Sequence, residues 1–75
     1  MPHVLITGFR RELRKISMTK AIQARAGLGL QDSKAITDAV LTGEQVAISV
    51  PSLDEAQALA AELEALGAIC EADPE

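Results

Sequence analysis

The residues best suited to chemistry in this 75-residue chain lie at one corner, in the stretch ARAGLGLQDSK at positions 24–34. Two leucines alternate with two glycines there, and a cation stands on either side, Arg25 before them and Lys34 after them. A connection that only turns the chain is usually polar, so leucines in this place call for a second explanation. Apolar groups set among charges are typical of a surface that binds another molecule.

Catalytic chemistry has few candidates in the sequence. His3 is the only histidine and lies near the N-terminus, where a solvated side chain is a simpler interpretation than a general base. Cys70 is the only cysteine and stands beside Glu71, which favours a buried neutral thiol over a nucleophile. The sequence holds no zinc-ligand cluster, and its GLG lacks the third glycine and the preceding strand of a dinucleotide-binding turn. We therefore expect a protein that is not an enzyme and uses no cofactor or metal.

Charge is divided between the two halves of the chain. The net charge is −4, yet residues 1–34 carry all seven cations against two acids, and residues 35–75 carry nine acids and no cation. Such a division in a small body creates a strong dipole, and a basic half on an acidic protein indicates a charged partner.

The length of the chain limits the architecture to one domain, over residues 1–75. A domain this short buries only about 60% of the surface of its unfolded chain, which leaves no room for an insulated active site. The longest apolar run near the N-terminus, VLITGF, is followed by arginines, which is the reverse of the order in a signal peptide. We therefore expect a cytoplasmic protein without a membrane-spanning segment.

The hydrophobic pattern predicts six elements in the order β-α-α-β-α-β. HVLITGF at residues 3–9, QVAISV at 45–50 and AICEAD at 68–73 are rich in strand-forming residues or alternate in polarity. Apolar residues at helical spacing predict three helices between these strands, over residues 17–26, 30–41 and 53–66. Packing all three helices on one face of the sheet buries every apolar face, so the predicted fold is an α+β two-layer sandwich.

The strand–helix–strand unit of residues 45–73 determines part of the sheet topology. A crossover of this kind is right-handed and leaves its two strands parallel. The strand at residues 3–9 then fits between them and runs antiparallel to both, in a sheet that is antiparallel or mixed. Within this strand Val4 and Ile6 share one face, with Gly8 next in phase.

Local signals mark the ends of the helices. Ser17 is the expected N-cap of the first helix, and Gly27 suits a left-handed residue after its last turn. Ser52 and Glu55, three positions apart, form a capping box for the third helix, which Gly67 ends.

Two interpretations fit the corner leucines, Leu28 and Leu30. In the first, a leucine attaches the corner to the core, but so tight a corner does not easily bury two side chains that point in opposite directions. In the second, the other leucine stays exposed, and the glycines let a partner's backbone come close. Either leucine is a candidate for the exposed one. The expected rim of cations around it consists of Lys15, Lys20, Arg25 and Lys34.

KISMTKAIQARAGLGLQDSKAITDAV at residues 15–40 resembles the C-terminal domain of the bacterial ribosomal stalk protein. SLDEAQALAAELEALGAICE at residues 52–71 is similar to the third helix and last strand of that family. The resemblance implies three helices against a three-stranded antiparallel sheet, and a first helical hairpin that contacts the GTP-hydrolysing translation factors on the ribosome. The positions that match the family's factor-binding face are Lys15, Ile16, Lys20, Gly29, Leu30 and Lys34, and the corner adds Leu28.

Three positions of the hairpin depart from the family pattern. Gln23 and Gln31 stand where the family has an arginine and a lysine, and Thr19 stands where it has an isoleucine. The resemblance therefore implies a surface that keeps its shape and loses some charge and apolar area. Because the sequence enters its first strand soon after Met1, we expect a free-standing relative without the family's dimerisation segment and hinge.

Two other binding functions stay open at this point. The basic segment 10–34 has the charge to contact RNA phosphates, although the whole chain is acidic and Phe9 is its only aromatic residue. The small sandwich also resembles the adaptor of the Clp protease, without that adaptor's acidic entry or recognition histidine. The prediction is a protein-interaction domain that docks a translational GTPase or another ribosome-associated partner through the first helical hairpin, in an oligomeric state left open.

Overall fold

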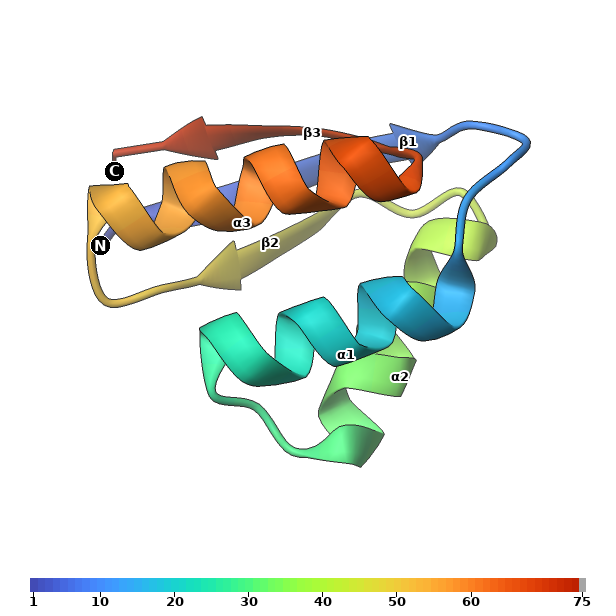
Figure 1. Cartoon of the computed structure of the whole chain (residues 1–75), viewed down its shortest axis with the longest axis horizontal. Coiled ribbons are helices and arrows are strands. Elements are labelled where there is room, and N and C mark those ends of the chain that lie inside the picture. Colours follow the sequence, from blue (N-terminus) through green and yellow to red (C-terminus); the bar gives the residue numbers. More distant parts are fainter. Residues whose placement is uncertain (75) are drawn as a thin grey trace.

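The elements of the computed structural model, which describes residues 1–74, follow one another in the predicted order β-α-α-β-α-β (Figure 1). The prediction of an α+β fold is therefore confirmed. The bounds of the elements are β1 His3–Phe9, α1 Lys15–Ala26, α2 Leu30–Leu41, β2 Val46–Ser49, α3 Leu53–Leu66 and β3 Ala68–Asp73.

β1 is the central strand of the three-stranded sheet, whose order is β2-β1-β3. It pairs antiparallel with both neighbours, so that Val4 lies opposite Ile48 of β2 and Ile6 lies opposite Cys70 of β3. Since β2 and β3 both run against β1, they are parallel to each other, as the predicted crossover requires. Every pairing in the sheet is antiparallel.

An irregularity in β1 overturns the expected phase of Gly8. The register between β1 and β3 shifts between Ile6 and Gly8, so that Gly8 lies opposite Ile69 and Phe9 lies opposite Ala68. Ile69 is exposed and Ala68 is buried, so Gly8 belongs to the open face of the sheet and not to the face of Ile6. An extra residue in one strand reverses the alternation of side chains beyond it, and a period of two read from the sequence cannot detect this.

The three helices lie on one face of the sheet (Figure 1). α2 and α3 contact the strands directly, and α1 packs on α2 and α3. The core between these layers is aliphatic, as the sequence predicts. Its largest fully buried side chains include Ile6, Met18, Ile22, Leu59 and Leu63.

Three of the predicted helix ends are confirmed. The Ser52 hydroxyl accepts a hydrogen bond of 3.2 Å from the backbone N–H of Glu55, which caps α3. Gly27 and Gly67 follow α1 and α3 with φ of 70° and 113°. A positive φ strains residues with a Cβ, and glycine at both positions avoids that strain.

The expected N-cap at Ser17 is wrong, because α1 begins at Lys15 and its N-cap is Arg14. The chain between β1 and α1 is held against the end of α3, where the N–H of Arg10 donates to the Gly67 carbonyl at 2.7 Å and the N–H of Arg14 donates to the Leu66 carbonyl at 3.0 Å. These bonds start the helix earlier than a capping side chain would. A tertiary contact has replaced the local signal at this end.

Candidate protein-docking surface

A buried row of hydroxyl groups joins α1 to α2. The hydroxyl oxygens of Thr19 and Thr37 lie 2.9 Å apart across the two helices, and each also lies within hydrogen-bond distance of a carbonyl in its own helix. Ser33 is fully buried in the same row and donates to the carbonyl of Gly29 at 2.9 Å. Small polar side chains let the two helices approach closely and satisfy their own hydrogen bonds while buried.

A groove of about 240 Å³ lies over this row, on the outer side of the hairpin. Two large apolar side chains line it, Ile16 from α1 with 75% of its surface exposed and Leu30 from α2 with 56% exposed. A second hollow of about 210 Å³ shares Ile16 and Thr19 with the first and extends along the hairpin to Thr37 and Asp38. The hairpin therefore presents an apolar recess to solvent.

Three lysines surround this recess. Lys20 and Lys34 line the first groove, and Lys15 and Lys34 line the second. All three are exposed to solvent, and none forms an ion pair within residues 1–74. We call this region the hairpin surface, and its residues are Lys15, Ile16, Thr19, Lys20, Leu30 and Lys34.

The structure distinguishes the two corner leucines. Leu28 is half-buried and packs against the core, while Leu30 is exposed in the groove. Gly29 between them has an extended backbone, with φ of −70°, and a Cβ built on it would meet nothing within 4 Å. Leu28 thus attaches the corner, and the space around Gly29 and Leu30 is open.

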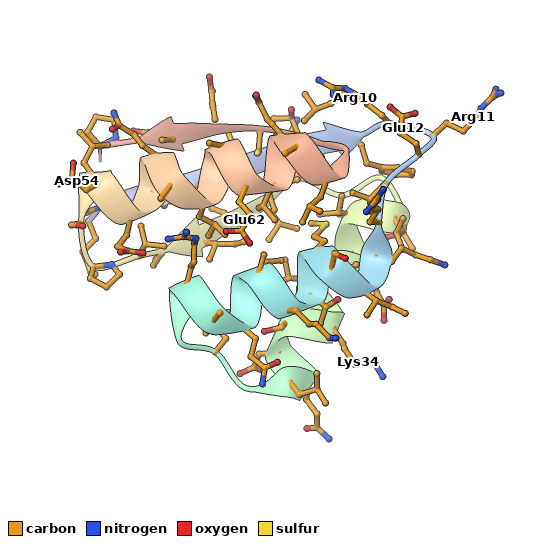
Figure 2. All side chains as sticks on the ribbon, in the orientation of Figure 1. Arg10, Arg11, Glu12, Lys34, Asp54 and Glu62 are labelled. Atoms are coloured by element: carbon orange, nitrogen blue, oxygen red, sulfur yellow. The ribbon has the colours of Figure 1, made fainter. Side chains whose placement is uncertain are left out.

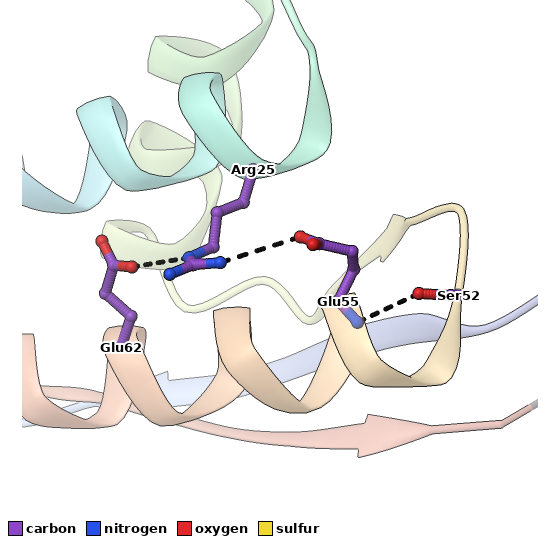
Figure 3. Close-up of polar contacts among 4 residues, drawn as sticks. All are labelled: Arg25, Ser52, Glu55 and Glu62. Carbon is purple, nitrogen blue, oxygen red and sulfur yellow. Dashed lines mark hydrogen bonds and ion pairs between the residues drawn. The ribbon is translucent and has the colours of Figure 1, made fainter.

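Arg25 does not belong to the cationic rim expected around the corner. It points to the opposite side of α1, where its Nε donates to Glu62 of α3 at 2.7 Å and its guanidinium lies 3.8 Å from Glu55 (Figure 3). The hydrogen bond to Glu62 and the charge of that carboxylate raise the pKa of Arg25 above its ordinary value. The two acids are seven residues apart on α3, which places them on one face, so Arg25 links the hairpin to α3.

The two side chains considered for catalysis, Cys70 and His3, do not form a catalytic arrangement with each other. Burial raises the pKa of the Cys70 thiol to about 11, and the thiol donates to the Ala60 carbonyl at 3.4 Å, so it is neutral and inert near pH 7. The Nε2 of His3 lies 3.5 Å from Asp73 on the sheet. Within residues 1–74 no group of three acidic, histidine or cysteine side chains gathers to hold a metal ion, and every helix is too short or too polar to cross a membrane.

Two residues of the candidate site were not predicted from the sequence. They are Thr37 and Asp38, which line the second hollow. The available signal was the spacing of Ser33 and Thr37, one helical turn apart, which places two hydroxyls on the face of α2 that meets α1. Hydroxyls on the inner face of an amphipathic helix indicate a close helix contact.

Comparison with known proteins identifies the family. Residues 3–73 match the family described as ribosomal protein L7/L12 C-terminal domain. The chain belongs to this family. Among curated L7/L12 relatives, it is 42% identical to the large ribosomal subunit protein bL12 of Tolumonas auensis over 57 residues, which cover 76% of this chain and 45% of that protein. The bL12 protein of Shewanella pealeana is 40% identical over the same shares of the two chains.

The chain therefore spans a little under half the length of the bL12 proteins it matches. A search of solved structures finds no significant match. The resemblance noted in the sequence is confirmed as membership of the L7/L12 C-terminal domain family, a family of ribosomal proteins that belongs to translation.

Proposed function

We propose that the hairpin surface docks a translational GTPase at the ribosome. The observation that carries the proposal is the groove in which Ile16 and Leu30 are exposed together, with Lys20 and Lys34 at its edge. An apolar centre inside a basic rim fits a partner that offers an apolar recess with acidic residues around it. Membership of the L7/L12 family and the resemblance of this hairpin to the family's factor-binding face support the same partner.

The size of the hairpin surface favours a weak and short-lived complex. Full burial of a large apolar side chain contributes about 1.5–3 kcal/mol to the free energy of binding. This range applies to Ile16 and to Leu30. Association costs at least about 4 kcal/mol in lost translational and rotational freedom, which offsets much of that gain. The lysines raise the rate of encounter more than they hold the complex. Such a site is suited to partners that bind briefly, one after another.

The proposed activity is binding and not catalysis. The only cysteine is buried and protonated, and the only histidine lies on the sheet and outside the hairpin surface. The proposed partner works on the ribosome, so the proposed location is the cytoplasm.

Titration of the ¹⁵N-labelled chain with a purified translational GTPase, loaded with a non-hydrolysable GTP analogue, tests the proposal. We expect amide signals of α1 and α2 to lose intensity first, with those of β3 unaffected. The double substitution Ile16→Ala, Leu30→Ala is expected to lower the affinity at least tenfold, since roughly 1.4 kcal/mol corresponds to a factor of ten. Because both side chains are exposed, its thermal unfolding should stay close to that of the unmodified chain.

The chain offers a matched control for this variant. Ile69 on β3 and Leu53 at the start of α3 are also exposed, at 47% and 38%, and lie outside the hairpin surface. The double substitution Ile69→Ala, Leu53→Ala removes the same number of atoms and is expected to leave the affinity unchanged. An equal loss of affinity in both variants, or a titration that leaves α1 and α2 unaffected, would contradict the proposal.

A further inference from the structure

The basic segment of residues 10–34 divides into two separate surfaces. Its three lysines belong to the hairpin surface, whereas Arg10, Arg11 and Arg14 lie in the turn between β1 and α1. Figure 2 shows Arg11 projecting from one end of the molecule and Arg10 lying along its upper edge above the strands, both well apart from Lys34 on α2. We call Arg10, Arg11 and Arg14 the arginine turn.

The backbone of the arginine turn is held in one conformation. Besides the bonds from Arg10 and Arg14 to the end of α3, the N–H of Leu13 donates to the Arg10 carbonyl at 3.1 Å. Leu13 is half-buried against the core and packs on Gly67, where an added Cβ would lie 2.7 Å from its Cα. The positions from which the arginines extend are therefore set before any ligand arrives, which lowers the entropy lost on binding.

The arginine turn carries a concentrated and unneutralised charge. All three arginines are exposed, and none forms an ion pair within residues 1–74. They place three cations against the single acid Glu12 in residues 10–14. Salt screens exposed charges over about 10 Å. Asp54 at the start of α3 lies at the opposite end of the long axis (Figure 2), whereas Glu64 stands in the last turn of α3, the end to which the arginine turn is hydrogen-bonded. The three arginines outnumber Glu12 and Glu64, so a ligand at the turn meets a net positive charge in spite of the acidic whole.

We propose that the arginine turn binds the phosphate backbone of single-stranded RNA. The planar guanidinium binds phosphate oxygens through two parallel hydrogen bonds, which an ammonium group does not do. The exposed side chains of the turn itself are all charged, unlike the hairpin surface with its apolar centre, and backbone binding to nucleic acid requires no apolar centre.

Phe9 favours the single-stranded form of the ligand. It ends β1 directly before Arg10, it is the only aromatic residue of the chain, and 37% of its surface is exposed. An aromatic face beside arginines is a platform on which an unpaired base stacks. The site uses none of the residues of the hairpin surface. RNA binding at the turn and GTPase docking at the hairpin are therefore tested independently of each other.

Fluorescence anisotropy with a labelled single-stranded RNA of about ten nucleotides tests this proposal. Three phosphate contacts give a slope of about −2 in a plot of log affinity against log salt concentration, at roughly 0.7 for each contact on a single strand. The variant Arg10→Ala, Arg11→Ala is expected to reduce that slope by about 1.4 and to lower the affinity about tenfold in low salt. Phe9→Leu should lower the affinity at every salt concentration and leave the slope unchanged, since stacking releases no counterions.

The lysines of the hairpin surface provide the matched control. Lys20→Ala, Lys34→Ala removes two positive charges from the same basic segment and should leave RNA binding unchanged, while Arg10→Ala, Arg11→Ala should leave GTPase binding unchanged. Equal loss of RNA affinity in both variants, a salt slope insensitive to the arginines, or equally strong binding of polyglutamate would overturn the proposal. The last result would assign the turn to an acidic protein.

Discussion

Two corners of this molecule share one backbone conformation but differ in what surrounds it. The α1–α2 corner and the α3–β3 corner both end a helix at a glycine of positive φ, Gly27 in the first and Gly67 in the second. A Cβ added at Gly27 would meet nothing within 4 Å, whereas one at Gly67 would lie 2.7 Å from the Cα of Leu13. The first corner is open to solvent, and the second is closed by the arginine turn.

The difference separates the proposed binding surface from a structural joint. Around the open corner, Leu30 is exposed and the neighbouring lysines have no acidic partners in residues 1–74. Around the closed corner, backbone groups of Leu66 and Gly67 accept hydrogen bonds from the turn, and β3 continues into the core through Ala68 and Cys70. The closed corner contributes to stability through these bonds, whereas the open corner is attached through Leu28 and leaves Leu30 exposed for the proposed partner.

Substitution of Gly67 should have the largest effect on stability. Gly67→Ala places a Cβ against backbone that cannot rotate away and adds the strain of a φ of 113°. We expect a loss of about 3 kcal/mol or more in the free energy of unfolding, which is a large part of the stability of so small a domain. Urea unfolding followed by circular dichroism measures it, since the chain has no tryptophan or tyrosine to report by fluorescence. A midpoint equal to that of the unmodified chain would show that the second corner is not closed.

Titration of Cys70, on β3 just after the closed corner, should have an intermediate effect on the free energy of unfolding. The pKa of this thiol rises from 9.0 in the unfolded chain to about 11 in the fold, so folding favours the neutral form. The resulting stability is fully present below pH 9 and is lost as the pH rises through 11. We expect the stability advantage over Cys70→Ala to shrink by roughly 1–2 kcal/mol between these limits. Urea unfolding of both chains at several pH values measures this, and a constant difference would contradict it.

Substitution of Gly27 should have the smallest effect of the three. Gly27→Ala meets no neighbouring atom, so only the left-handed backbone opposes it, at a cost of about 1 kcal/mol. The same urea experiment compares it directly with Gly67→Ala, and the difference between the two measures how firmly the arginine turn closes the second corner. A loss as large as that of Gly67→Ala would mean that the first corner is packed as well.

Much of the fold could be predicted because its signals are local. The alternation of Val46 and Ile48, the apolar stripe of α3 and the cap at Ser52 depend on neighbours within a few residues. The two errors in the fold, at Gly8 and at Ser17, have a common cause. In each case a distant segment decided the local geometry, through the register with β3 or through hydrogen bonds to the end of α3.

The sequence by itself determined the order of the elements, the aliphatic core and the presence of a basic, leucine-containing corner, since residue types and their spacing suffice for these. Only the tertiary structure decided which leucine is exposed, that Arg25 pairs with Glu62, and that the basic segment forms two surfaces. The physical reason is that exposure and charge pairing depend on which elements pack together. Residues that are neighbours in one helix can face different partners, and no spacing along the chain records what stands opposite each of them.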